Sequence, residues 1–142
     1  MKGNATVLKH LSIALENEIV ALNQYYLHSK MLKNWGFLKL ADKLYQESIE
    51  EMKHADVLIE RILFLEGRPN MELSKLNIGS TVPKMLEKDL KLEQKAIKDL
   101  KAAIIDSDKH KDFASQAVFQ QILEEEEPHV EWIEAQIGLI DK

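Results

Sequence analysis

The chain has 142 residues, 30% of them charged, with a net charge of −5 at pH 7 and no cysteine. One ordinary domain of this length (residues 1–142) can bury a real core. The composition excludes disulfides, thiolate metal sites and cysteine nucleophiles, and the lack of a basic patch argues against nucleic-acid binding. No apolar run approaches membrane-spanning length and no apolar signal core follows the first residues, so we expect a cytoplasmic protein without a membrane segment.

Apolar residues recur every three or four positions in four stretches, which predicts four long helices and no strand. The expected helices cover about 4–34, 38–65, 81–108 and 111–140, with ends set by capping and breaking residues. Residues 67–80 form a long connection rich in turn signals. Two short loops and one long connection fit an all-α four-helix bundle in which a crossover joins the second helix to the third.

Each predicted helix has one line of apolar residues that faces the core, which we call its seam. Charged residues interrupt the seam of every predicted helix near its middle. The first and third seams each hold a glutamate, and the second and fourth each hold a glutamate and a histidine three residues apart on one helical face. These residues are Glu18, Glu93, the pair Glu51 and His54, and the pair Glu126 and His129. Burying unpaired carboxylates is costly, and two divalent metals would balance four of them. The seams therefore predict a two-metal centre in the bundle core.

The two Glu-x-x-His pairs are a weak motif by themselves, and their position on the seams carries the prediction. The alternative is that these polar side chains lie at the seam edges and reach water or pair with lysine and arginine. Carboxylate-rich sites with one imidazole per metal suit iron or manganese, with zinc as a competitor that has no redox chemistry. The residues alone leave iron and manganese open.

Over essentially its whole length the chain resembles the bacterioferritins. The match is close and specific in residues 47–56 and 59–67, and it continues in residues 17–25, in Asn34-Trp35-Gly36, and in the tail from Glu126 to Trp132. The resemblance implies a ferritin-like four-helix bundle and an iron-storage protein. It further implies a ferroxidase, which oxidises Fe(II) with oxygen or peroxide and stores ferric mineral in a shell of twenty-four subunits.

By this resemblance each subunit holds two iron ions in a di-iron centre. The implied ligands are two bridging carboxylates, Glu51 and Glu126, and two terminal pairs, Glu18 with His54 and Glu93 with His129. Tyr25 is expected to donate a hydrogen bond to a ligand carboxylate. The alternative for Tyr25 is a core aromatic whose hydroxyl is satisfied elsewhere.

Met52 points away from the metal seam, on a second apolar stripe with Tyr45, Ile49 and Ile59. A helix that is apolar on two sides packs against two neighbours, and the second is most simply another subunit. By itself a methionine there is usually an adaptable interface filler. The resemblance implies instead that Met52 from each of two subunits ligates haem b at their interface. Such a haem would carry electrons for iron release, from a small ferredoxin partner.

Three features depart from the family pattern. Many bacterioferritins have a histidine at the place of Gln46, so we expect the inner-surface iron site that it forms with residue 50 (here Glu50) to be weak or altered. Pro128 lies inside the fourth helix and predicts a local kink and a looser or gated His129. The sequence ends at Lys142, where the family continues into a short fifth helix, so a dimer or a wider-pored cage are alternatives to the full shell.

The positions of several other polar residues along the helices predict whether they are buried or exposed. Glu47 lies on the second seam and is either a carboxylate that supports the ligands or passes iron, or the polar end of the core. In the run from Glu124 to Glu127 only Glu126 is in register, which predicts a solvated face for the other three. His10, His28 and His110 have no partner pattern and are expected at the surface.

Two other classes of function remain open on the sequence. One is a di-iron oxidoreductase without storage, such as a peroxide-reducing bundle related to rubrerythrin. The other is a structural or haem-binding bundle without two-metal chemistry.

Overall fold

Four long helices and no strand make up the protein, in a computed structural model that describes all 142 residues. The helices are α1 (Ala5–Asn34), α2 (Leu38–Phe64), α3 (Val82–Lys109) and α4 (Phe113–Ile140). Every boundary lies within two residues of the sequence prediction, and the predicted fold class is confirmed. None of the four helices combines the length and the apolar character that crossing a membrane requires.

Local chemistry explains where the helices begin. The side chains of Asn4, Thr81 and Asp112 accept hydrogen bonds from backbone N–H groups in the first turns of α1, α3 and α4, which satisfies donors that have no partner within the helix. The turn between α1 and α2 contains Gly36 with φ 91°, a conformation that glycine adopts at little cost. The sequence therefore places the starts of α1, α3 and α4 locally, whereas α2 starts after Phe37 without a side-chain cap.

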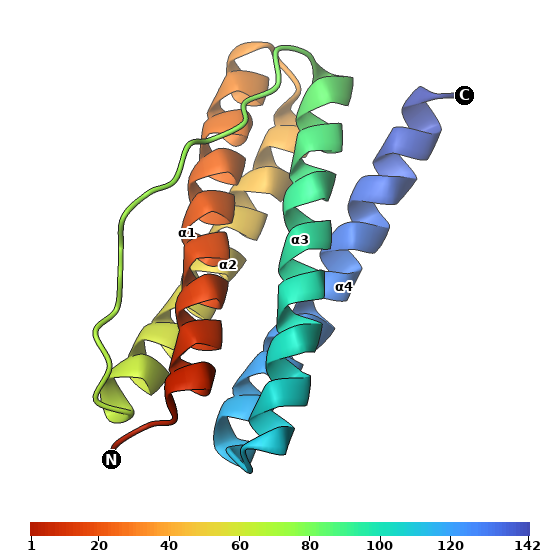
Figure 1. The fold of residues 1–142 in the computed structure, drawn as a ribbon. Coiled ribbons are helices and arrows are strands. Elements are labelled where there is room, and N and C mark those ends of the chain that lie inside the picture. The colour runs from red at the N-terminus through yellow and green to blue at the C-terminus, as the bar shows by residue number, and fades with distance from the viewer.

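The helices form two antiparallel pairs, α1 with α2 and α3 with α4, joined by the predicted crossover (Figure 1). The crossover runs along the outside of α1 for nearly the whole length of the bundle (Figure 1). Hydrogen bonds fix it at successive levels: the Ser74 hydroxyl donates to Glu16 at 3.0 Å, and the Asn77 N–H donates to Gln24 at 3.0 Å. The crossover is thus part of the packed structure.

Apolar side chains gather in two clusters toward opposite ends of the bundle. The larger has 13 buried residues around Leu11, Leu58 and Phe119, and the smaller has six around Tyr25 and Leu44. Burying these side chains supplies the main driving force for folding. The stretch of core between the two clusters contains the predicted metal ligands.

One predicted surface residue, His28, is fully buried, so that prediction is wrong. Its Nδ1 lies 2.9 Å from Asp89 Oδ1, and its Nε2 accepts a hydrogen bond from the Gly79 N–H at 3.0 Å. The crossover covers His28 from outside, which the pattern of α1 cannot reveal. His110 is exposed as expected, and His10 is partly buried against Asp106.

Pro128 lies on the exposed side of α4, and the helix continues through it from Phe113 to Ile140. The missing N–H of the proline removes one hydrogen bond on the solvent side of the helix. The predicted local kink and the mobility of His129 stay predictions.

Candidate metal centre

All six residues predicted as ligands meet in the middle of the bundle. They come from the core-facing seams of all four helices. Each is almost inaccessible to solvent: Glu18 2%, Glu51 1%, His54 3%, Glu93 1%, Glu126 1% and His129 8% exposed. None of the six pairs with a lysine or an arginine; their contacts are among themselves and with Tyr25, Glu47 and Glu125. These side chains therefore neither reach water nor pair with lysine or arginine, as they would if they lay at the edges of the seams.

The six side chains form two overlapping groups of four. One group is Glu18, Glu51, His54 and Glu126, and the other is Glu51, Glu93, Glu126 and His129. Within each group, one nitrogen or oxygen per residue lies within 4.8 Å of all the others. Two carboxylates, Glu51 and Glu126, belong to both groups. This geometry can hold two metal ions side by side with two shared carboxylates.

Each histidine turns its Nδ1 toward the carboxylates. Nδ1 of His54 lies 2.9 Å from Glu126 Oε1, 3.5 Å from Glu18 Oε2 and 3.6 Å from Glu51 Oε2. Nδ1 of His129 lies 3.1 Å from Glu51 Oε1 and 3.9 Å from Glu126 Oε2. The two rings therefore approach the shared carboxylates from different helices, α2 and α4.

Several of these buried atoms make no hydrogen bond. They are Glu18 Oε2, His54 Nδ1, Glu93 Oε2 and both carboxylate oxygens of Glu126. Leaving one buried polar atom unsatisfied costs about 1–3 kcal/mol, so a group of them is a large expense for a core. Carboxylate oxygens and imidazole nitrogens are also the donors that iron and manganese accept. The residues present therefore fit a pair of divalent metals.

Electrostatics point in the same direction. Burial raises the pKa of Glu18, and both burial and the neighbouring carboxylates raise the pKa values of Glu51, Glu93 and Glu126. Burial lowers the pKa of His54, but the surrounding carboxylates outweigh that effect and raise it. Without metal the centre thus attracts protons, because it is a concentration of negative charge with no fixed cation nearby.

Tyr25 is fully buried and its hydroxyl donates a hydrogen bond to Glu93 Oε1. Burial raises the pKa of Tyr25 well above its usual value, and the charge of Glu93 raises it further. The hydroxyl therefore keeps its proton and acts as a donor. This contact is the one expected for a residue that orients a ligand carboxylate.

Glu47, whose role the sequence left undecided, adjoins the His129 half of the centre. It is 2% exposed, its Oε2 lies 3.1 Å from His129 Nδ1, and Lys43 Nζ lies 3.6 Å from its Oε1. Burial raises the pKa of Glu47 to about 7. Neither of its oxygens makes a hydrogen bond, so it is a further acceptor at the edge of the ligand set.

An open pocket of about 720 Å³ between α2 and α4 connects this edge to the surface. Its lining includes Glu47 and His129 at the centre, and Gln46, Glu50 and Glu124 further out. Carboxylates dominate its polar wall. The pocket is the opening through which solvent approaches the metal centre.

The prediction of a solvated face for Glu124, Glu125 and Glu127 is wrong for Glu125. Its Oε2 lies 2.6 Å from His54 Nε2, although 43% of its side chain is exposed. Register on the seam could not find it, because it reaches the outer edge of the imidazole ring rather than the core.

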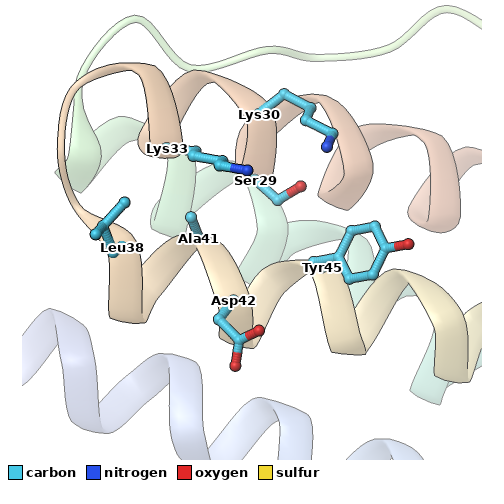
Figure 2. A pocket seen from close by; sticks show the side chains of 7 residues that line it. All are labelled: Ser29, Lys30, Lys33, Leu38, Ala41, Asp42 and Tyr45. Carbon is cyan, nitrogen blue, oxygen red and sulfur yellow. The ribbon is translucent and has the colours of Figure 1, made fainter.

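Met52 is 48% exposed on an apolar face that also carries Tyr26 and Tyr45. A hollow of about 220 Å³ lies beside it. Next to this face, the end of α1 and the start of α2 line another pocket of about 340 Å³, where Lys30 of α1 lies opposite Tyr45 of α2 and Lys33 lies nearer Ala41 (Figure 2). No predicted metal ligand lines either cavity. This face is therefore separate from the metal centre.

Comparison with known proteins places these features in a family. A family model described as a ferritin-like domain matches residues 8–142. The chain is 44% identical to a bacterial ferritin of Pseudomonas aeruginosa over 99% of its own length and 92% of that protein. It is 45% identical to a bacterioferritin of Brucella melitensis, and 43% identical to one of Mycolicibacterium paratuberculosis, over its whole length and 89% and 90% of those proteins. The chain belongs to the bacterioferritin family of ferritin-like proteins.

Proposed function

We propose that this protein stores iron and removes free Fe(II), by oxidising it to Fe(III) in the buried centre and holding the product as ferric mineral inside an oligomeric shell. One observation carries the proposal: two groups of four ligands share Glu51 and Glu126 in a core where five ligand atoms have no hydrogen bond. Membership of the bacterioferritin family supports iron as the metal and storage as the purpose.

The two overlapping groups support a role for each ligand. Glu51 and Glu126 belong to both groups and would be shared by two ferrous ions, with Glu18 and His54 completing one site and Glu93 and His129 the other. Two adjacent ferrous ions give one electron each, and with two protons these reduce dioxygen to hydrogen peroxide or hydrogen peroxide to water. A single ferrous ion cannot supply both electrons, which is the chemical reason for a paired site.

The side chains prepare this reaction before any metal arrives. The raised pKa values of the four ligand carboxyls mean that binding of cations displaces protons. Tyr25 holds the Glu93 carboxylate in place. The apolar clusters on both sides keep water out of the centre, which strengthens the attraction between metal and carboxylates.

Iron approaches through the pocket between α2 and α4. The pocket's carboxylates attract cations, and Glu47 lies where the pocket meets His129. In this role Glu47 receives an ion from the pocket and transfers it to the Glu93–His129 half. The replacement of a family histidine by Gln46 leaves Glu50 as the acidic ligand further out, so no strong accessory iron site is expected there.

Residues 1–142 form one domain, and copies of it pair through the apolar face around Met52 before assembling into the shell. Met52 of each of two copies would hold haem b between them, and the haem would pass electrons from a ferredoxin partner for iron release in the cytoplasm. The exposure of Met52 and Tyr26 on this face supports a covering subunit.

Stopped-flow absorbance after mixing metal-free protein with Fe(II) and oxygen or peroxide tests the ferroxidase. The expected result is a fast ferric signal that saturates at two iron ions per subunit. A rate no faster than that of Fe(II) in buffer would reject the proposal and favour a bundle without two-metal chemistry.

Sedimentation velocity separates storage from the rubrerythrin-like alternative, because a shell sediments far ahead of a dimer of 16.4 kDa chains.

Substituting Met52→Leu is expected to abolish haem binding and leave fast iron oxidation intact. Unchanged haem content in that variant would remove Met52 from the haem site.

A further inference from the structure

The two histidines of the metal centre differ in what holds the ring nitrogen that faces away from the carboxylates. Nε2 of His54 lies 2.6 Å from Oε2 of Glu125. The hydrogen bond and ion-pair contacts of His129 all involve its Nδ1, and its Nε2 has no partner in the protein. The two halves of the centre therefore have the same kinds of ligand. They differ in that only the histidine of one half has a protein partner for its Nε2.

Glu125 fixes the tautomer of His54. The side chain of Glu125 is 43% exposed, and a carboxylate in contact with water accepts hydrogen bonds. The proton of the contact must then be on His54 Nε2, which leaves Nδ1 as the ring nitrogen that can bind a metal. Nδ1 is the atom that faces Glu18, Glu51 and Glu126 without a hydrogen bond.

Two successive residues of α4 hold the ring from both sides. Glu126 Oε1 lies 2.9 Å from Nδ1 on the inner side, and Glu125 Oε2 lies 2.6 Å from Nε2 on the outer side. The other oxygen of Glu125 accepts from the Gln121 side chain at 3.3 Å, one turn earlier on the same helix. His54 is thus oriented by a carboxylate that is itself anchored.

We propose that Glu125 is a positioning residue that presents the His54 lone pair to the metal, so that the Glu18–His54 half of the centre binds metal more tightly and fills before the Glu93–His129 half. The inference rests on the proposed function, since it assumes two metal ions at these six ligands. A carboxylate behind a ligand histidine fixes its direction and raises its basicity, and losing it typically weakens metal binding about 10–100-fold.

Cobalt(II) titration of the full-length metal-free protein tests the proposal, because cobalt(II) reports binding by its visible absorption without being oxidised by air during the measurement. The wild type is expected to bind two ions per subunit with unequal affinities. Glu125→Ala should weaken the tighter site about 10–100-fold and bring the two sites together. Glu125→Gln should lose less, because an amide oxygen still accepts from Nε2–H.

Glu127→Gln is the matched control. Glu127 lies two residues along the same helix, is exposed and makes no hydrogen bond or ion pair, so the same change of charge there should leave both affinities unchanged. Circular dichroism of each metal-free variant checks that the helices remain folded.

A double-mutant cycle shows whether Glu125 acts through His54. In a His54→Ala background, Glu125→Ala should cause no further loss of cobalt affinity, whereas in a His129→Ala background it should cause its full loss. Nitrogen-15 NMR of the zinc-loaded wild type should show His54 protonated at Nε2. Equal losses in both backgrounds, or an effect of Glu125→Ala no larger than that of Glu127→Gln, would overturn the inference.

The failure of the inference can be told from the failure of the function. If the wild type binds two cobalt ions and Glu125 has no effect on either, only the positioning role falls. If the wild type binds fewer than two ions per subunit, both the proposed two-metal centre and the positioning role of Glu125 are rejected.

Discussion

Two clusters of buried polar residues lie in the same bundle, and they differ in how their atoms are satisfied. In the first, Gln24 and His28 of α1 both contact Asp89 of α3 at 2.9 Å. The crossover completes that cluster through the N–H groups of Gly79 and Asn77, which donate at 3.0 Å. None of its side-chain atoms lacks a partner.

The second cluster, the candidate metal centre, has the same kinds of residue in a comparably dry place, but five atoms of its proposed ligands make no hydrogen bond. The first cluster supplies its own donors and acceptors and so is complete as protein. The second has an excess of acceptors and no fixed cation. Burial of ionisable groups is therefore not by itself a sign of a metal site, whereas an unmatched excess of acceptors is.

The largest expected effect comes from removing a shared ligand. Glu51→Ala takes one carboxylate from both metal positions, so the fast phase of Fe(II) oxidation should slow by more than the ~10–100-fold typical of residues outside the ligand set. Stopped-flow absorbance measures it. A rate within a few-fold of the wild type would show that Glu51 is no bridging ligand.

Glu51→Ala also tests whether the carboxylates of the centre destabilise the metal-free protein. Because Glu51→Ala removes a buried charge from a group of carboxylates, the metal-free protein should unfold at the same or a higher temperature than the wild type. Calorimetry of metal-free samples checks this. A clear fall in the unfolding temperature would mean that the carboxylates support one another without metal.

Metal binding should stabilise one cluster and leave the other unaffected. At a free metal concentration about 100 times the dissociation constant, each occupied site adds ~2.7 kcal/mol to the free energy of unfolding. Thermal unfolding with zinc(II) measures the gain, which Glu51→Ala should largely abolish. Asp89→Ala should retain the full gain, since Asp89 lies outside the centre.

Asp89→Ala should destabilise the metal-free protein, unlike Glu51→Ala. The substitution leaves the His28 Nδ1–H and the Gln24 amide without their acceptor, at a cost of about 1–3 kcal/mol for each buried donor. Chemical denaturation measures it, with Asp108→Ala on the exposed end of α3 as the control. Equal stability of the two variants would show that this cluster contributes nothing to the fold.

The pH dependence gives the smallest expected effect. Burial raises the pKa of Glu47 from 4.5 to about 7 in the folded protein. A raised folded-state pKa stabilises the fold fully below the unfolded value and loses that contribution as the pH rises toward the folded value. Between pH 4.5 and about 7 the metal-free wild type should therefore lose stability relative to Glu47→Gln, which chemical denaturation at several pH values measures. A constant difference between the two proteins across this range would contradict the raised pKa.

The comparison also shows how far the sequence could predict this protein. The helix boundaries and the burial of the six proposed ligands follow from local signals: caps at Asn4 and Thr81, and polar residues in register on the buried apolar faces. A seam reports which side chains face the core, and the geometry of four packed helices then brings Glu18, Glu93 and the two Glu-x-x-His pairs together.

What the sequence missed depends on contacts that no single helix encodes. His28 is buried because the crossover lies over it, and its partner Asp89 is 61 residues away. Glu125 is out of register with the seam but reaches His54 at the outer edge of the ring. Glu47 is in register, yet only its distance to His129 distinguishes an edge of the metal centre from an end of the core.

The central claim is that the unsatisfied carboxylates of the core exist to bind two cations. A crystal of the protein soaked anaerobically in Fe(II) and measured at the iron absorption edge tests it most directly. We predict two anomalous peaks per subunit, both within bonding distance of Glu51 and Glu126, with His54 beside one and His129 beside the other. A core without iron, with these carboxylates turned to solvent or paired with lysine and arginine, would contradict the account.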